Sequence, residues 1–115
     1  MSERASPRGE ATSLLAVIEG ALGPLHAAIA PDVLRLGDLQ VQIEHSLPAG
    51  ITPQLHWSVT ESGRAGLRVT AYLGQVADPR PAVRAILTYV VADPVSGKPS
   101  LLDAEREARV AALRG

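Results

Sequence analysis

The sequence predicts an α+β domain in which one antiparallel sheet packs against a long hydrophobic helix. Three observations predict it: an apolar helical segment comes first, four segments of alternating hydrophobicity follow, and short turns separate those segments. Short turns between consecutive strands favour antiparallel pairing. We therefore expect a sheet of four to five strands wrapped around a central hydrophobic helix, with a short helix after the last strand.

The central helix is expected to begin after Thr12 or Ser13, because either residue can serve as its N-cap. From Leu14 on, apolar residues occupy almost every side of the helix, which is typical of a helix buried on most faces. Gly23-Pro24 should break or kink it before a short continuation that ends at Ala30.

Residues 1–11 are small, polar and charged, and they include a proline and a glycine. This composition predicts a flexible N-terminal tail. The remaining length is enough for one hydrophobic core but not for two, so we expect a single domain over residues 12–114.

The four strand segments alternate between apolar and polar residues, as strands with one buried face do. Leu39, Val41 and Ile43 alternate with polar side chains in the first of them, and a turn region over residues 31–38 precedes it. Turn residues bound each segment. The expected strands cover residues 39–47, 51–63, 66–76 and 82–93.

The last predicted element is a short helix rich in alanine and arginine. Ser100 begins a capping box, Ser-Leu-Leu-Asp, and the helix should continue to about Leu113. Its interleaved glutamates and arginines are typical of a solvated helix face with pairs four residues apart.

Composition excludes several classes of function. The net charge is −1 and no cluster of lysine and arginine occurs, so we expect neither nucleic acid nor an anionic membrane as a partner. The absence of cysteine excludes disulfides, thiol catalysis and cysteine-ligated zinc, and it suits a reducing cytoplasm. The apolar run over residues 14–30 is too short and too interrupted to span a bilayer, and Glu19 within it argues against a signal peptide.

Glu19 is the one charged residue in the segment LLAVIEGALG. Two interpretations are open: the carboxylate reaches water or a basic group at the edge of the helix, or it lies in a pocket and takes part in chemistry. A charge placed deep in an apolar environment without a partner is costly, so an idle buried carboxylate is not expected.

Four segments together carry a resemblance to a known family. Residues 10–23, EATSLLAVIEGALG, are similar to the helix His-Gly-Gly-x-Leu-Ala-x-x-Ala-Asp-x-Ala-Leu-Gly of the phenylacetyl-CoA type of acyl-CoA thioesterase. Residues 42–50 resemble that family's strand ending in Asp-Phe-Leu-Arg-Pro, residues 58–64 its strand with a Gly-Arg turn, and residues 83–99 its last strand and closing turn. The resemblance implies the hotdog fold, in which a sheet wraps around a central helix.

The resemblance also implies roles for individual residues. Glu19 falls where the family carries its catalytic carboxylate, which attacks the acyl carbon or activates water. Backbone N–H groups near Thr12 and Ser13, at the expected start of the helix, would hold the oxyanion. Arg64 follows the glycine of the Gly-Arg turn and would contact the phosphates of coenzyme A, or else it is an exposed turn arginine.

The histidines are weaker candidates. His26 lies seven residues after Glu19, hence on nearly the same helical face, where it would assist the carboxylate or simply be exposed at a helix end. His45 stands where the family is usually aromatic, so it would pack or line the substrate groove. No local histidine spacing supports a metal site, and we expect neither a metal nor a cofactor.

Two departures from the family stand out. The strand that precedes the family's helix has no counterpart in residues 1–11, and the family's His-Gly-Gly is Glu10-Ala11-Thr12 here. The side chains of Ala11 and Thr12 would obstruct an approach that glycines allow.

Three hypotheses follow. The first is an acyl-CoA thioesterase that forms a homodimer or a dimer of dimers through the edge strand over residues 39–47. The second is a catalytically silent hotdog dimer that binds an acyl group, coenzyme A or a protein partner. The third is an unrelated α+β protein whose exposed edge and apolar helix serve oligomerisation.

Overall fold

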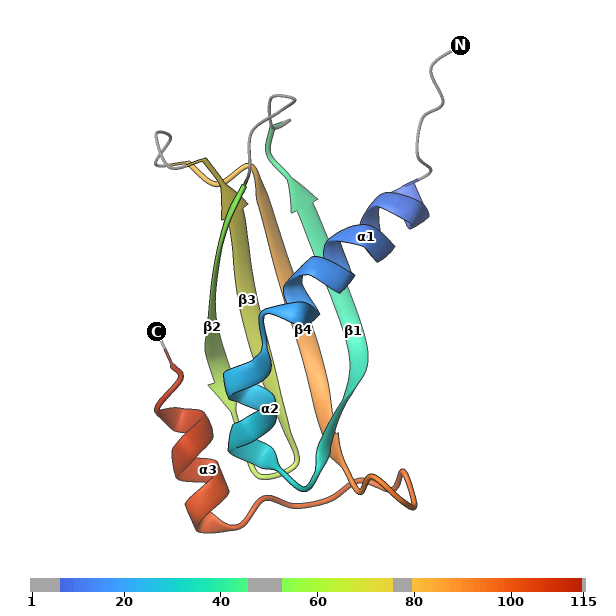
Figure 1. Cartoon of the computed structure of the whole chain (residues 1–115), viewed down its shortest axis with the longest axis vertical. Coiled ribbons are helices and arrows are strands. Elements are labelled where there is room, and N and C mark those ends of the chain that lie inside the picture. The colour runs from blue at the N-terminus through green and yellow to red at the C-terminus, as the bar shows by residue number, and fades with distance from the viewer. Residues whose placement is uncertain (1–6, 46–52, 76–79, 115) are drawn as a thin grey trace.

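Four antiparallel strands form one sheet, and two of the helices lie across one face of it (Figure 1). The computed structural model describes residues 7–45, 53–75 and 80–114, with side chains from residue 14 on. None of the described helices is long and apolar enough to cross a membrane. The elements in chain order are α1 (Pro7–Gly20), α2 (Gly23–Ile29), β1 (Val33–Ile43), β2 (Gln54–Ser62), β3 (Gly66–Gly74), β4 (Val83–Ala92) and α3 (Ala104–Ala111).

The strand order in the sheet is β1-β4-β3-β2, so the first two strands of the chain lie at opposite edges. All neighbouring strands are antiparallel, as the short turns predict. Alternation also predicts the buried face correctly: Leu67, Val69 and Ala71 of β3 are buried, and Val59 of β2 lies on the same side. The α+β class and the four strands inferred from the sequence are therefore confirmed.

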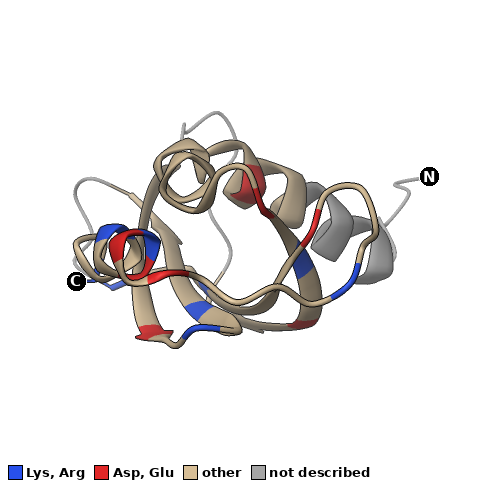
Figure 2. Cartoon of the chain, turned by 90° about the horizontal axis from the view of Figure 1, so that it is seen from below, with Lys and Arg blue, Asp and Glu red and all other residues tan. Residues whose placement is uncertain are grey.

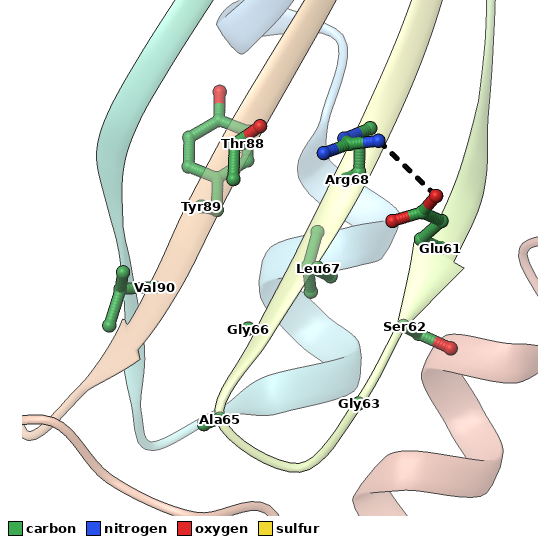
Figure 3. Close-up of a pocket in the computed structure, with 10 residues that line it drawn as sticks. All are labelled: Glu61, Ser62, Gly63, Ala65, Gly66, Leu67, Arg68, Thr88, Tyr89 and Val90. Atoms are coloured by element: carbon green, nitrogen blue, oxygen red, sulfur yellow. Dashed lines mark hydrogen bonds and ion pairs between the residues drawn. The ribbon is translucent and has the colours of Figure 1, made fainter.

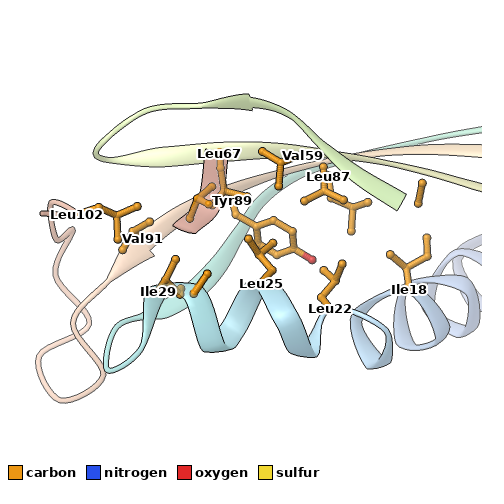
Figure 4. Packing of buried hydrophobic residues seen from close by; sticks show 14 of the residues in the cluster. Ile18, Leu22, Leu25, Ile29, Val59, Leu67, Leu87, Tyr89, Val91 and Leu102 are labelled. Atoms are coloured by element: carbon orange, nitrogen blue, oxygen red, sulfur yellow. The ribbon is translucent and has the colours of Figure 1, made fainter. Parts of the chain in front are cut away.

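The core lies between this face of the sheet and the helices α1 and α2 (Figure 4). Ile18, Leu22, Leu25 and Ile29 are almost completely buried, and their spacing of three and four residues forms one continuous apolar stripe. The stripe runs across the break between the two helices, which falls at residues 21–22. Both helices therefore cover the sheet with a single face.

The helix α1 differs from expectation at both its start and its surface. It begins at Pro7 rather than after Thr12 or Ser13, so residues 7–11 of the expected tail are helical. Proline is well suited to the first position of a helix, because its missing N–H needs no partner there and its φ is already helical. The expectation that this helix is buried on most faces is wrong within this chain: Val17 is 54% exposed, because the sheet covers only one side of the helix.

The strand β1 begins at Val33, so most of the turn region expected over residues 31–38 is extended. The pairing with β4 shifts by one residue between Leu36 and Asp38. Such a bulge interrupts the alternation on which the expectation rested. The strand ends at Ile43, and the last residues of its expected range lie outside the described part of the chain.

The helix α3 is capped by Asp103 and not by Ser100, so the predicted capping box is wrong. The Asp103 carboxylate accepts a hydrogen bond from the backbone N–H of Arg106 at 2.8 Å. This bond stabilises the ionised carboxylate and so lowers the pKa of Asp103. The hydroxyl of Ser100 instead donates to the carboxylate of Asp32 at 3.0 Å.

Asp32 is the anchor that holds α3 against α2 and the start of β1. Its side chain is 8% exposed, and Nη1 of Arg106 lies 2.6 Å from its Oδ2. The same nitrogen donates to the carbonyl oxygen of Ile29 at 3.2 Å. With Ser100 included, the Asp32 carboxylate is bonded by two donors from the C-terminal segment, as a buried charge requires.

The residues after α3 cover part of the β2 edge. The backbone N–H of Val59 donates to the carbonyl oxygen of Leu113 at 3.1 Å, and Arg114 forms a parallel bridge with Val59. Leu102, before α3, and Val110, within it, are completely buried, so the C-terminal part of the chain belongs to the core. Acidic and basic positions are interspersed in α3 and elsewhere in the described chain (Figure 2).

The buried ion pair leads to a stability prediction. Replacing Arg106→Ala leaves the Asp32 carboxylate without its strongest partner, and we expect the Tm to fall by about 5–10 °C. Arg109→Ala is the matched control, because its ion pair with Glu105 is exposed. Differential scanning calorimetry would measure both variants. Equal Tm values for Arg106→Ala and the unaltered protein would contradict the anchoring role of Asp32.

Candidate functional site

Glu19 lies at the C-terminal end of α1, beside the buried apolar stripe. Ile18 and Leu22 point into the core, and the side chain of Glu19 between them in sequence is half-buried. Because the stripe fixes the rotation of the helix, Glu19 is placed at the boundary between core and solvent. The carboxylate therefore does not simply extend into water.

Tyr89 of β4 is the partner of Glu19. Its hydroxyl donates a hydrogen bond to Oε2 of Glu19, with 3.0 Å between the oxygens. The tyrosine is 1% exposed, and its ring lies between the strands and the helices (Figure 4). In the sheet it pairs with Leu36 on one side and Leu67 on the other.

This hydrogen bond gives a partner to two polar groups beside the core, the Tyr89 hydroxyl and the Glu19 carboxylate. A buried tyrosine hydroxyl needs a partner, and a hydrogen bond to a carboxylate is stronger than one between neutral groups. Burial raises the pKa of Tyr89 above its ordinary value, and the hydrogen bond and negative charge of Glu19 raise it further. Tyr89 therefore remains protonated and acts as a donor toward Glu19.

The other expected side chains lie on separate elements. His26 is exposed on α2, beyond the break at residues 21–22 that separates it from Glu19 on α1. His45 is half-buried just beyond β1, where its backbone N–H donates to the carbonyl oxygen of Ala82 at 3.3 Å. Within the described residues, Glu19 is brought together with Tyr89 rather than with these histidines.

Arg64 is exposed in the turn between β2 and β3. Its Nε donates to the carbonyl oxygen of Leu102 at 3.4 Å, and its own carbonyl oxygen accepts from the N–H of Leu102 at 2.8 Å. The turn is thus attached to the segment that leads into α3.

Thr12 and Ser13 lie inside α1, in its second turn. The free N–H groups of a helix are those of its first turn, here residues 7–10, whereas later N–H groups bond the carbonyl four residues back. The expectation of free donors at Thr12 and Ser13 depended on a helix that starts there, and that start is wrong.

A groove of about 510 Å³ lies at the end of the sheet where β2 and β3 are joined (Figure 3). Arg68 and Glu61 on its wall form an ion pair at 3.2 Å. A Cβ at position 66 would lie 2.7 Å from the carbonyl oxygen of Tyr89, which is too close for a side chain. Gly66 therefore leaves this part of the wall without one. The Arg68 guanidinium in this groove is therefore already paired with the Glu61 carboxylate.

Tyr89 is the site residue that the sequence analysis missed. It stands in the strand AILTYVVA, where Ala85, Leu87 and Val91 share its inward face. A tyrosine at a position that alternation assigns to the core must place its hydroxyl on a partner. That signal was present in the sequence, although it does not say which group accepts the hydrogen bond.

The chain matches no protein-family profile and no curated protein sequence. Its fold does match solved structures. A Pseudomonas aeruginosa protein superposes with a TM-score of 0.78 at 11% identity, covering 100% of this chain and 89% of that one. A predicted thioesterase from Bacillus stearothermophilus gives 0.78 at 13%, covering 100% and 93%. A Thermus thermophilus thioesterase in complex with coenzyme A and zinc gives 0.72 at 17%, covering 96% and 93%.

The protein therefore has the hotdog fold of these thioesterase structures. The resemblance inferred from four sequence segments is confirmed at the level of the fold. Among the described residues, no group of three or more histidine, aspartate and glutamate side chains is arranged to hold a metal ion.

The Glu19–Tyr89 contact leads to a prediction about ionisation. The chain has two tyrosines, so a Tyr72→Phe variant contains Tyr89 alone. We expect its tyrosinate absorbance to appear well above the ordinary value of 10.0, because burial and the Glu19 carboxylate both favour the neutral hydroxyl. The folded state then binds more protons than the unfolded state above about pH 10, so stability falls as pH rises through that range. Absorbance that rises around pH 10 in the folded variant would contradict the buried contact.

Proposed function

We propose that the protein hydrolyses an acyl-CoA thioester, with Glu19 as its catalytic carboxylate. The observation that carries this proposal is the half-buried position of Glu19, held by Tyr89 at the end of the central helix. The resemblance aligns Glu19 with the catalytic carboxylate of the thioesterase family. The shared fold supports the same assignment.

In the proposed reaction Glu19 acts as a general base or as a nucleophile. As a base, it takes a proton from water while the water oxygen bonds to the acyl carbon. The tetrahedral intermediate then collapses, the carbon–sulfur bond breaks, and the proton passes to the leaving thiolate. As a nucleophile, the Glu19 carboxylate attacks the acyl carbon, the carbon–sulfur bond breaks, and the coenzyme A thiolate leaves as an anhydride forms between Glu19 and the acyl group. Water then hydrolyses the anhydride, which restores the Glu19 carboxylate and releases the free acid, whose proton passes to the thiolate. Both routes need only water and the carboxylate, without a cofactor.

Coenzyme A is the proposed carrier of the acyl group. One structural neighbour, the Thermus thermophilus thioesterase, is in complex with coenzyme A. Arg64 is exposed and is the candidate for its phosphates, because a guanidinium matches phosphate geometry. His45, half-buried beyond β1, is the candidate for lining the acyl groove, and His26 remains a predicted contributor from α2.

We also propose a homodimer that forms through β1. This strand is an edge of the sheet, and an edge strand presents unpaired backbone groups to a second strand. Leu36 and Ile43 on it are 37% and 60% exposed, and Val17 on α1 is exposed as well. In Figure 1, α1 crosses the sheet and extends past the β1 edge. A two-fold pairing of β1 strands would cover these apolar side chains. We propose the cytoplasm as the location of this dimer, because a chain without cysteine suits a reducing compartment.

A catalytically silent dimer that binds an acyl group or coenzyme A is the second candidate. One observation favours it: Thr12 and Ser13, the expected oxyanion donors, lie inside α1. A missing oxyanion donor commonly costs about 10²–10³-fold in kcat. The silent binder would retain affinity for acyl-CoA without releasing a thiol.

The first experiment replaces the carboxylate. The purified protein is incubated with a panel of acyl-CoAs, and released coenzyme A is measured with a thiol reagent. Glu19→Gln should lower kcat/KM by about 10²–10⁴-fold, because the amide cannot accept the proton. Glu61→Gln is the control, since that carboxylate is exposed and paired with Arg68. Turnover that Glu19→Gln leaves intact rejects Glu19 as the catalytic group, and acyl-CoA binding without any turnover supports the silent dimer.

The second experiment tests the edge. Ile43→Lys places a charge on β1 near the partner's strand, and it should convert a dimer into a monomer because charged edge residues oppose strand addition. Val95→Lys is the control, since Val95 is 94% exposed in the segment after β4. Sedimentation velocity would give the mass of each variant. An Ile43→Lys protein that remains dimeric would place the interface elsewhere.

A further inference from the structure

We propose that Tyr89 is a positioning residue for Glu19: its hydroxyl fixes Oε2 of the carboxylate and leaves Oε1 as the reacting oxygen. This inference rests on the proposed function, in which Glu19 is the catalytic group. It assigns the two oxygens of the carboxylate different tasks, one structural and one chemical.

The two side chains differ in mobility. A glutamate has three rotatable bonds, and Glu19 is followed by Gly20, the last residue of α1. Tyr89 has two such bonds, and its ring is 1% exposed among close-packed side chains. A hydrogen bond of 3.0 Å from the rigid partner therefore restricts the flexible one.

The backbone of Tyr89 is held from both sides. It belongs to β4, which lies between β1 and β3, and it pairs with Leu36 and with Leu67. At the neighbouring position, Gly66 approaches so closely that a Cβ would lie 2.7 Å from the carbonyl oxygen of Tyr89. The hydroxyl is thus at the tip of a side chain whose base is fixed within the sheet.

The hydrogen bond between Tyr89 and Glu19 has one direction. Burial and the nearby carboxylate keep the tyrosine protonated, so its hydroxyl donates and does not accept a proton from Glu19. The bond therefore runs from Tyr89 to Glu19, and Oε2 is the oxygen that accepts it.

The second oxygen of the Glu19 carboxylate, Oε1, remains available for chemistry. The hydroxyl contacts Oε2, and within the described residues no further donor bonds the Glu19 carboxylate. Oε1 therefore keeps its lone pairs for a water molecule or an acyl carbon. Fixing one oxygen also fixes the direction in which the other points, which matters because a misplacement of about 1 Å can cost about 10²-fold in rate.

The test is Tyr89→Phe, which removes the hydroxyl and keeps the ring. We expect kcat for acyl-CoA hydrolysis to fall by about 10–100-fold with KM unchanged, since the lost contact orients the catalytic group rather than the substrate. Tyr72→Phe is the matched control, because Tyr72 is 40% exposed on β3, and its kcat should equal that of the unaltered protein. An unchanged kcat in Tyr89→Phe would overturn the positioning role.

A double-variant cycle separates positioning from packing. If Tyr89 acts through Glu19, adding Tyr89→Phe to Glu19→Gln lowers the residual kcat no further. An equal loss in both backgrounds, or a rise in KM alone, would assign Tyr89 to packing and overturn the proposal.

A second variant covers the case in which Tyr89→Phe does not fold. Glu19→Asp leaves Tyr89 intact and withdraws the carboxylate by one methylene, so it should also lower kcat with KM unchanged, whereas an unaltered kcat would overturn the role. Absence of turnover in the unaltered protein would reject the proposed function and the positioning role together. Turnover that both variants leave intact would reject the positioning role alone.

Discussion

The arrangement of the whole site depends on one packing constraint: a four-stranded sheet has one apolar face, and a single stripe of helix residues must cover it. Ile18 and Leu22 belong to that stripe, so the rotation of α1 about its axis is fixed. Glu19, the residue after Ile18, is thereby placed at the boundary of the core. The Glu19 carboxylate can then reach Tyr89, which projects from β4 toward the helices. The polar contact is a consequence of apolar packing, and moving the stripe by one residue would remove it.

Much of the fold follows from periodicity alone. Alternation of period two identifies four strands and the buried face of β2 and β3, and the apolar run before them identifies the helical layer. Periodicity fails where another constraint is stronger. The bulge between Leu36 and Asp38 hides the first half of β1, and Asp103 competes successfully with Ser100 for the helix cap. Long-range contacts such as Asp32 with Arg106 have no local signal in the sequence.

The candidate site could be predicted in part. Glu19 was identified because a charge in an apolar run requires an explanation and because the family resemblance places a carboxylate there. Its partner Tyr89 is 70 residues away, and only the fold brings the two together. The oxyanion donors expected at Thr12 and Ser13 illustrate the opposite case. Their assignment depended on the start of a helix, which is the least certain feature of a sequence-based prediction.

The C-terminal segment over β2 has a consequence for how copies of the chain could assemble. The carbonyl of Leu113 occupies the N–H of Val59, and Arg114 donates to the carbonyl oxygen of Thr60. One edge of the sheet is thus partly closed from within the chain, while β1 remains open among the described strands. Sheets with two open edges can add copies without limit and form fibres. In the proposed dimer through β1, a sheet whose second edge is covered adds no further copy, so the segment after α3 would limit assembly through sheet edges to two chains.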